Sequence, residues 1–163
     1  MKKLTLLAAI LVCVLALAKD KNKAAKPDPW AGTWKLDISK STFPNPAMAP
    51  KDETVTTEAQ APGSNVIKWS AKGTGPDGQA FTESYDGKSD GQPYALLRNG
   101  QEVAKVAYHR DNDHQYSSNA TGADGTTSTG TITLDKSGKI ITIKEHIKSP
   151  QGEFDQTVVF TKT

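Results

Sequence analysis

The alternation of apolar and polar residues along most of the chain constrains its fold more than any other feature. In the segment 66–72, the apolar Ile67, Trp69 and Ala71 alternate with two lysines and a serine. Successive side chains of a strand point to opposite faces, so this period of two predicts strands with one buried face. The same pattern recurs in the segments 52–59, 81–85, 104–108, 132–134, 141–147 and 154–160.

Short turn sequences separate these segments at regular spacing. Asn99-Gly100 predicts a tight hairpin, because both turn positions need a positive φ. The segment 43–51 holds three prolines and is predicted to be a loop. Further turns are predicted at 61–65, 75–78, 86–93, 111–113, 122–125, 135–138 and 149–152.

The sequence therefore predicts an all-β fold with no helical period. Short connections favour pairing between consecutive strands, which gives an antiparallel up-and-down meander of about nine or ten strands. A flat meander of that length would leave two exposed edges. We therefore expect a closed or nearly closed barrel, since closure removes both edges.

The chain begins with a segment that is typical of export. Residues 1–18 comprise a start with two lysines, an apolar run and an Ala-Leu-Ala end, which predicts a signal peptide cleaved after Ala18. The apolar run is too short for a stable membrane span, although an N-terminal anchor is the alternative. Residues 19–29 are polar and predict a flexible linker, followed by a single domain over 30–163. We expect a periplasmic or secreted protein with no membrane span after processing.

Charge and cysteine content limit the partners. The chain has 20 lysines and arginines against 18 acidic residues, but Lys2 and Lys3 belong to the predicted signal. The remainder has no basic surplus, so nucleic acid is not an expected partner. The one cysteine, Cys13, also lies in the signal. The domain must therefore rely on its core and backbone hydrogen bonds rather than on disulfides.

The stretch WAGTWKLDISKS at 30–41 predicts the first strand, with Trp34, Leu36 and Ile38 on its buried face. A predicted export signal, Gly32-Thr33-Trp34 and then a β-meander resemble the lipocalin-like (calycin-type) barrels. The layout also resembles a group of small secreted bacterial proteins without an assigned role.

The lipocalin-like resemblance implies that Trp34 closes the floor of a barrel whose interior holds a small hydrophobic molecule. In lipocalins this tryptophan packs on an arginine of the last strand. Here the last strand offers Lys162.

The predicted inward face carries the candidate binding residues. Alternation places aromatic side chains there together with two carboxylates, which a cavity or barrel mouth accommodates better than a packed core does. The alternative is that both carboxylates lie in solvent at strand ends, or that a bulge turns them outward. The predicted ligand-binding residues are Trp69, Glu83, Tyr85, Tyr108 and Glu145.

The sequence gives less support to a catalytic site or a metal site. The predicted domain has no cysteine and no G-x-S-x-G motif, and its three histidines have charged neighbours that favour surface positions. The segment 109–114, HRDNDH, is the densest set of metal-ligand types, but its Asp-Asn-Asp centre is ordinary turn chemistry. We expect no cofactor and no metal.

Three functions follow from these observations. The first is an exported barrel that binds a small, partly apolar molecule, and the second is a non-catalytic envelope or interaction protein with a filled core. The third is a hydrolase that uses the inward carboxylates Glu83 and Glu145 in acid–base chemistry. We expect a non-enzyme, and an empty interior would distinguish the first function from the second.

Overall fold

The structure, a computed structural model, describes residues 27–163. The predicted signal and most of the predicted linker lie outside the described residues. The described chain folds into ten strands and two short 3₁₀ turns. The strands are β1 (Gly32–Leu36), β2 (Asp52–Thr57), β3 (Val66–Thr74), β4 (Ala80–Lys88), β5 (Asp90–Arg98), β6 (Gln101–Asn112), β7 (Gln115–Gly122), β8 (Thr127–Leu134), β9 (Ile140–Ser149) and β10 (Gly152–Lys162).

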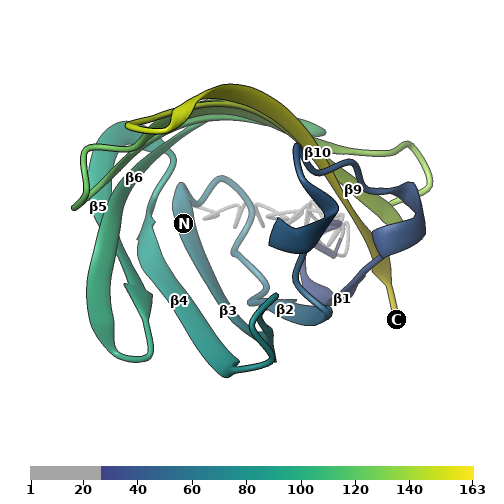
Figure 1. Ribbon diagram of the computed structural model, residues 1–163. Coiled ribbons are helices and arrows are strands. Elements are labelled where there is room, and N and C mark those ends of the chain that lie inside the picture. The colour runs from purple at the N-terminus through teal and green to yellow at the C-terminus, as the bar shows by residue number, and fades with distance from the viewer. Residues whose placement is uncertain (1–26) are drawn as a thin grey trace, which may run out of the picture.

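The ten strands form one closed antiparallel barrel in which each strand pairs with its neighbours in sequence (Figure 1). The first and last strands complete the ring, because Trp34 of β1 lies opposite Lys162 of β10 and Leu36 opposite Phe160. This arrangement confirms the predicted all-β up-and-down meander. Of its two predicted forms, closed or nearly closed, the barrel is closed.

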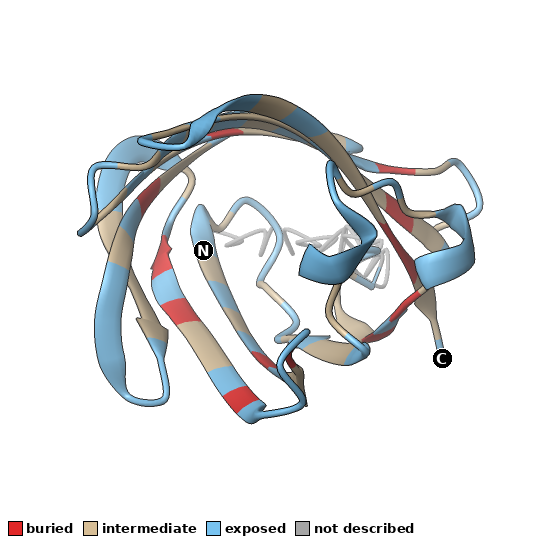
Figure 2. Ribbon diagram, viewed as in Figure 1, coloured by how far each residue is buried: buried red, intermediate tan, exposed pale blue. Residues whose placement is uncertain are grey.

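Burial follows the predicted alternation in strands such as β4, although not in β5 or at the end of β10 (Figure 2). In β4, the buried Phe81, Tyr85 and Gly87 alternate with exposed residues that face solvent. The predicted Asn99-Gly100 hairpin is confirmed, since both residues have positive φ, 52° and 80°. Local sequence chemistry thus accounts for the strands and for the connection from β5 to β6.

The predicted position of Ile38 is wrong. Trp34 and Leu36 are buried, but Ile38 is 44% exposed and belongs to the 3₁₀ turn η1 (Ile38–Lys40). The chain leaves the sheet after Asp37, whose amide still donates to the carbonyl oxygen of Val159. The Asp37 carboxylate then accepts bonds within the turn, from Ser39 at 2.6 Å and Lys40 at 2.7 Å. These local bonds replace the ladder that an extended chain would make. A second 3₁₀ turn, η2 (Pro46–Met48), lies in the predicted proline-rich loop.

The chain turns within the predicted segment 86–93, but the turn is much shorter than predicted, because every residue of that segment except Ser89 belongs to a strand. β4 continues to Lys88 and β5 begins at Asp90. Pro93 is accommodated in β5 because β4 and β5 pair only between Glu83–Tyr85 and Leu96–Arg98. Its missing N–H therefore removes no ladder bond to β4.

Side chains fill one end of the barrel. Six buried residues from the lead-in segment and four strands pack into a single cluster there: Trp30, Trp34, Leu36, Leu134, Ile141 and Phe160. Within residues 27–163, no helix has the length and apolarity to cross a bilayer. The closed end leaves the rest of the barrel interior available for a site.

Candidate functional site

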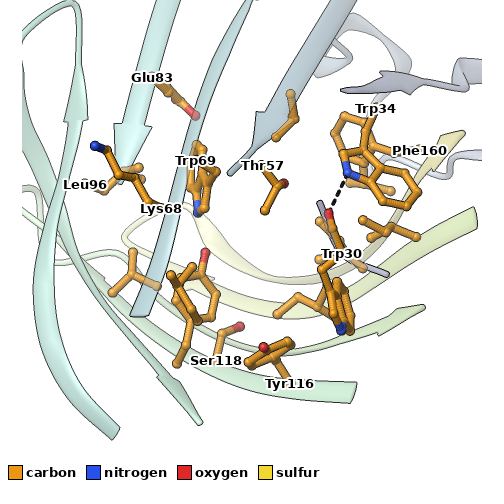
Figure 3. Close-up of a pocket in the computed structure, with 18 of the residues that line it drawn as sticks. Trp30, Trp34, Thr57, Lys68, Trp69, Glu83, Leu96, Tyr116, Ser118 and Phe160 are labelled. Atoms are coloured by element: carbon orange, nitrogen blue, oxygen red, sulfur yellow. Dashed lines mark hydrogen bonds between the residues drawn. The ribbon is translucent and has the colours of Figure 1, made fainter. Parts of the chain in front are cut away.

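A cavity of about 460 Å³ occupies the barrel interior. Every one of the ten strands contributes at least one lining residue, so the cavity belongs to the whole barrel (Figure 3). Valine, leucine and isoleucine form much of the wall, while all three tryptophans of the chain, Trp30, Trp34 and Trp69, also line it. The interior is therefore not filled by side chains.

The lead-in to β1 is attached to the closed end. The Asp28 carboxylate accepts bonds from the amides of Trp30, at 3.0 Å, and Gln60, at 3.1 Å. The Trp30 indole donates to the carbonyl oxygen of Asp113 at 3.0 Å and packs edge-on against Tyr116. Residues 28 and 29 of the predicted linker are thus held against the barrel, and the cavity floor includes a segment that precedes the first strand.

Trp34 lies in the floor of the cavity, where the sequence predicted it. Its indole is 1% exposed and donates to the carbonyl oxygen of Trp30 at 3.1 Å (Figure 3). The Lys162 ammonium lies 4.8 Å from the centre of the Trp34 ring and donates to the carbonyl oxygen of Pro29. Lys162, the basic residue that the sequence offered in the last strand, therefore makes a cation–π contact with Trp34.

The three predicted aromatic residues lie together at one part of the wall. Trp69 and Tyr108 line the cavity, whereas Tyr85 is 1% exposed and is not a lining residue. Tyr85 stacks on Trp69 with ring centres 6.1 Å apart and meets Tyr108 edge-on at 5.0 Å. Its hydroxyl donates to the carbonyl oxygen of Val106, which holds the ring behind the other two.

The pKa of the Tyr108 hydroxyl is influenced by the other predicted binding residues. Burial raises the pKa of its phenol, and Tyr85, Glu145 and Glu83 raise it further, while the Trp69 indole acts in the opposite direction. All four other predicted residues therefore affect this one hydroxyl. Whether the group contacts a ligand stays a prediction.

Glu83 and Glu145 both line the cavity. Neither lies in solvent at a strand end. The Glu83 side chain is 19% exposed and faces Arg98 at 3.4 Å, whereas Glu145 accepts a 2.7 Å bond from the Gln156 amide. Burial raises the pKa of Glu83, and Arg98 opposes that shift.

Glu53 is a third inward carboxylate, which our sequence reasoning missed. It lies two residues before Val55, so the alternation along β2 was a signal that could have identified it. Burial raises its pKa to about 7, with Glu83 adding to the shift and Arg98 opposing it. Its proximity to Glu83 requires the pairing of β2, β3 and β4, which residue patterns do not reveal.

The histidine-rich segment 109–114 forms no ligand set. His109 bonds Asp111 at 3.1 Å on the exposed surface, and Asp111 also accepts from Gln115 and Ser117. Across residues 27–163, no three histidine, cysteine, aspartate or glutamate side chains are grouped as a metal would require.

Comparisons with solved structures find designed barrels. No protein-family profile matches the chain, and no curated protein matches it. A structure of EF1p2_mFAP2b bound to DFHBI is 13% identical, with a TM-score of 0.47, covering 83% of this chain and 94% of that one. The redesigned β-barrel mFAP1 bound to DFHBI is 16% identical at a TM-score of 0.45, with coverage of 82% and 95%.

A third similar structure is a fluorescence-activating β-barrel that was designed de novo. It is 14% identical at a TM-score of 0.41, and the match covers 82% of this chain and 93% of the design. The lipocalin-like family assignment therefore stays a prediction.

Proposed function

We propose that this protein is an exported, lipocalin-like barrel that binds a small, partly apolar molecule in its interior. The observation that carries the proposal is the cavity of about 460 Å³ lined by all ten strands. Sites for small molecules are concave, mostly apolar and of roughly 300–1,000 Å³. The proposed export rests on the pattern of residues 1–18.

The lining supports a ligand with both apolar and polar parts. Aliphatic side chains such as Val106, Ile132 and Ile143 offer contact without hydrogen bonds. A smaller set of polar groups faces the same space, which orients a ligand and sets its specificity. These polar lining residues include Glu53, Glu83, Tyr108, Ser118, Ser128, Glu145 and Gln156.

The alternative of an interaction protein with a filled core requires an interior that side chains occupy. The cavity disfavours that function. We also propose a binding protein rather than a hydrolase. The proposal assigns the inward carboxylates Glu83 and Glu145 to recognition.

Filling the cavity tests the proposal. Adjacent residues of β7 provide a matched pair, since Ala120 lines the cavity and Asn119 is exposed outside. We expect the wild-type protein to bind the neutral fluorescent probe N-phenyl-1-naphthylamine with enhanced probe emission. Ala120→Phe should weaken that binding by about tenfold or more, because the new ring occupies the space.

The control is Asn119→Phe, which adds the same ring to the outer face and should leave probe affinity unchanged. Thermal unfolding of both variants establishes that each retains the fold. A wild-type protein that leaves the probe emission unchanged, or equal effects of the two substitutions, would contradict the proposal.

A further inference from the structure

We infer that the ligand of this cavity is a cationic amphiphile, an apolar body that bears a protonated amine or quaternary ammonium group. This inference rests on the proposed function and adds the charge of the ligand to it. The charges and ring faces of the cavity wall carry the argument.

The ionisable lining residues are predominantly acidic. Four carboxylates line the cavity, from Asp28, Glu53, Glu83 and Glu145, against the single ammonium of Lys68. Lys68 makes its ion pairs with Glu58 at 3.4 Å and with Asp86 at 3.9 Å, neither of which lines the cavity.

The Asp28 carboxylate is already engaged, because it holds the lead-in segment to the closed end. The inward charge is therefore that of the three glutamates.

These glutamates have little matching positive charge, since Arg98 is the one cation paired with any of them among the described residues. Within residues 27–163, the Glu53 carboxylate makes no hydrogen bond or ion pair, and the only partner of the Glu145 carboxylate is the neutral Gln156 amide. Glu83 faces Arg98 at 3.4 Å, but that guanidinium also lies 4.3 Å from the Phe81 ring centre and is 42% exposed. A buried carboxylate without a counter-charge is costly, so a cation in the cavity would stabilise Glu53 and Glu145 and would add to the partial neutralisation of Glu83 by Arg98.

The aromatic rings indicate where the cation would lie. Lys162 already lies over Trp34, and Arg110 lies 5.9 Å from the Tyr116 ring centre. Trp69 and Tyr108 also line the cavity, and neither has a cation over its ring among the residues that the structure describes. A ligand ammonium would find these two ring faces beside the carboxylates that affect Tyr108, those of Glu83 and Glu145.

The inference is tested with three probes of equal chain length: nonan-1-amine, nonan-1-ol and nonanoate. Emission of the three tryptophans, all in the cavity wall, reports binding without an added dye. At pH 8 the amine is protonated, and we expect it to bind at least about tenfold more tightly than the alcohol. Nonanoate should bind more weakly than the alcohol, because its charge repels the glutamates.

Two variants test which side chains recognise the ammonium group. Glu83→Gln and Glu145→Gln each remove one inward charge and keep the side-chain shape. Each substitution should weaken the binding of nonan-1-amine by about tenfold and change the affinity for nonan-1-ol by less than about threefold. Glu102→Gln removes an exposed charge of β6 and is the matched control, expected to leave all three affinities unchanged.

The outcomes separate this inference from the proposed function. Equal affinity for the three probes, or tighter binding of nonanoate, would overturn the cationic ligand while the barrel remained a binding protein. The inference would also be overturned if Glu102→Gln weakened the binding of nonan-1-amine as much as Glu83→Gln and Glu145→Gln do. Binding of none of the three probes would overturn the inference together with the proposed function.

Discussion

At the scale of single residues, Glu53 is the carboxyl group whose pKa is raised furthest above its ordinary value. Its pKa rises from the ordinary 4.5 to about 7, first because it is buried and second because Glu83 lies close to it. The folded protein therefore holds a proton at Glu53 between these values, where the unfolded chain has released it. The free energy of unfolding must fall as pH rises through this window, since the folded state binds more protons.

We predict that Glu53→Gln removes this pH dependence. The neutral amide has the shape of the protonated acid, so the variant should match the wild type near pH 4.5 and exceed it at pH 8 by about 1–3 kcal/mol. Urea unfolding at several pH values measures the difference. The exposed Glu102→Gln serves as the control, and a constant difference between Glu53→Gln and wild type across pH would contradict the assignment.

At the scale of elements, the contact between β4 and β5 is one of two sparsely paired contacts in the ring, the other being that between β1 and β10. Only three residues of each strand are paired there, whereas β9 and β10 are paired at ten positions. Two tyrosine rings pack beside this gap, because an added side chain on Gly87 would lie 2.7 Å from both Tyr85 Oη and Tyr94 Cγ. The cohesion of this part of the barrel comes from ring packing more than from a hydrogen-bonded ladder.

We predict that the barrel opens locally at the contact between β4 and β5 more readily than between β9 and β10. Peptides that cover residues 86–95 should exchange amide hydrogens at least about tenfold faster than peptides that cover 140–149, because their backbone groups have fewer ladder partners. Hydrogen exchange followed by mass spectrometry measures both in one sample. Equal protection of the two regions would show that the tyrosine packing compensates for the missing pairs.

At the scale of the whole molecule, the barrel has one packed end and a hollow remainder. The cluster that includes Trp30, Trp34 and Phe160 packs at one end and forms that end of the cavity wall, while the partly buried Trp69 lines the cavity outside this cluster. Burial of apolar surface dominates the stability of a domain, so the packed end should contribute more of it than the hollow part does. The hollow part contains carboxyl groups, whose burial in a packed core would be unfavourable. We place the ligand in this part of the barrel.

Replacing single tryptophans by alanine tests whether the packed end contributes more stability than the hollow part. Trp34→Ala should lower the free energy of unfolding by about 3–5 kcal/mol, because a packed site cannot collapse around the lost ring. Trp69→Ala should lower the free energy of unfolding clearly less, because Trp69 is only partly buried whereas Trp34 is 1% exposed. Urea denaturation compares the two, and equal losses would mean that stability is spread evenly over the barrel.

Local sequence determined much of this structure. Alternation and turn chemistry identified the all-β fold, the order of strands and the inward direction of Trp69, Glu83, Tyr108 and Glu145, because these depend on neighbours a few residues apart. The same reasoning was wrong where local bonds or missing pairs changed the path of the chain. Ile38 turns outward through the side-chain bonds of Asp37, and the turn expected over 86–93 is confined to Ser89, with Pro93 tolerated in β5 because it meets no ladder from β4.

The tertiary structure alone decided the rest. The pairing of β1 with β10 closes the ring, brings Lys162 over Trp34 and leaves about 460 Å³ empty inside. The tie between Asp28 and Gln60, and the approach of Glu53 to Glu83, likewise join different elements. Alternation reports which face of a strand is buried but not how strongly a sheet curves or what it encloses. Those properties depend on strand pairing summed around the whole ring.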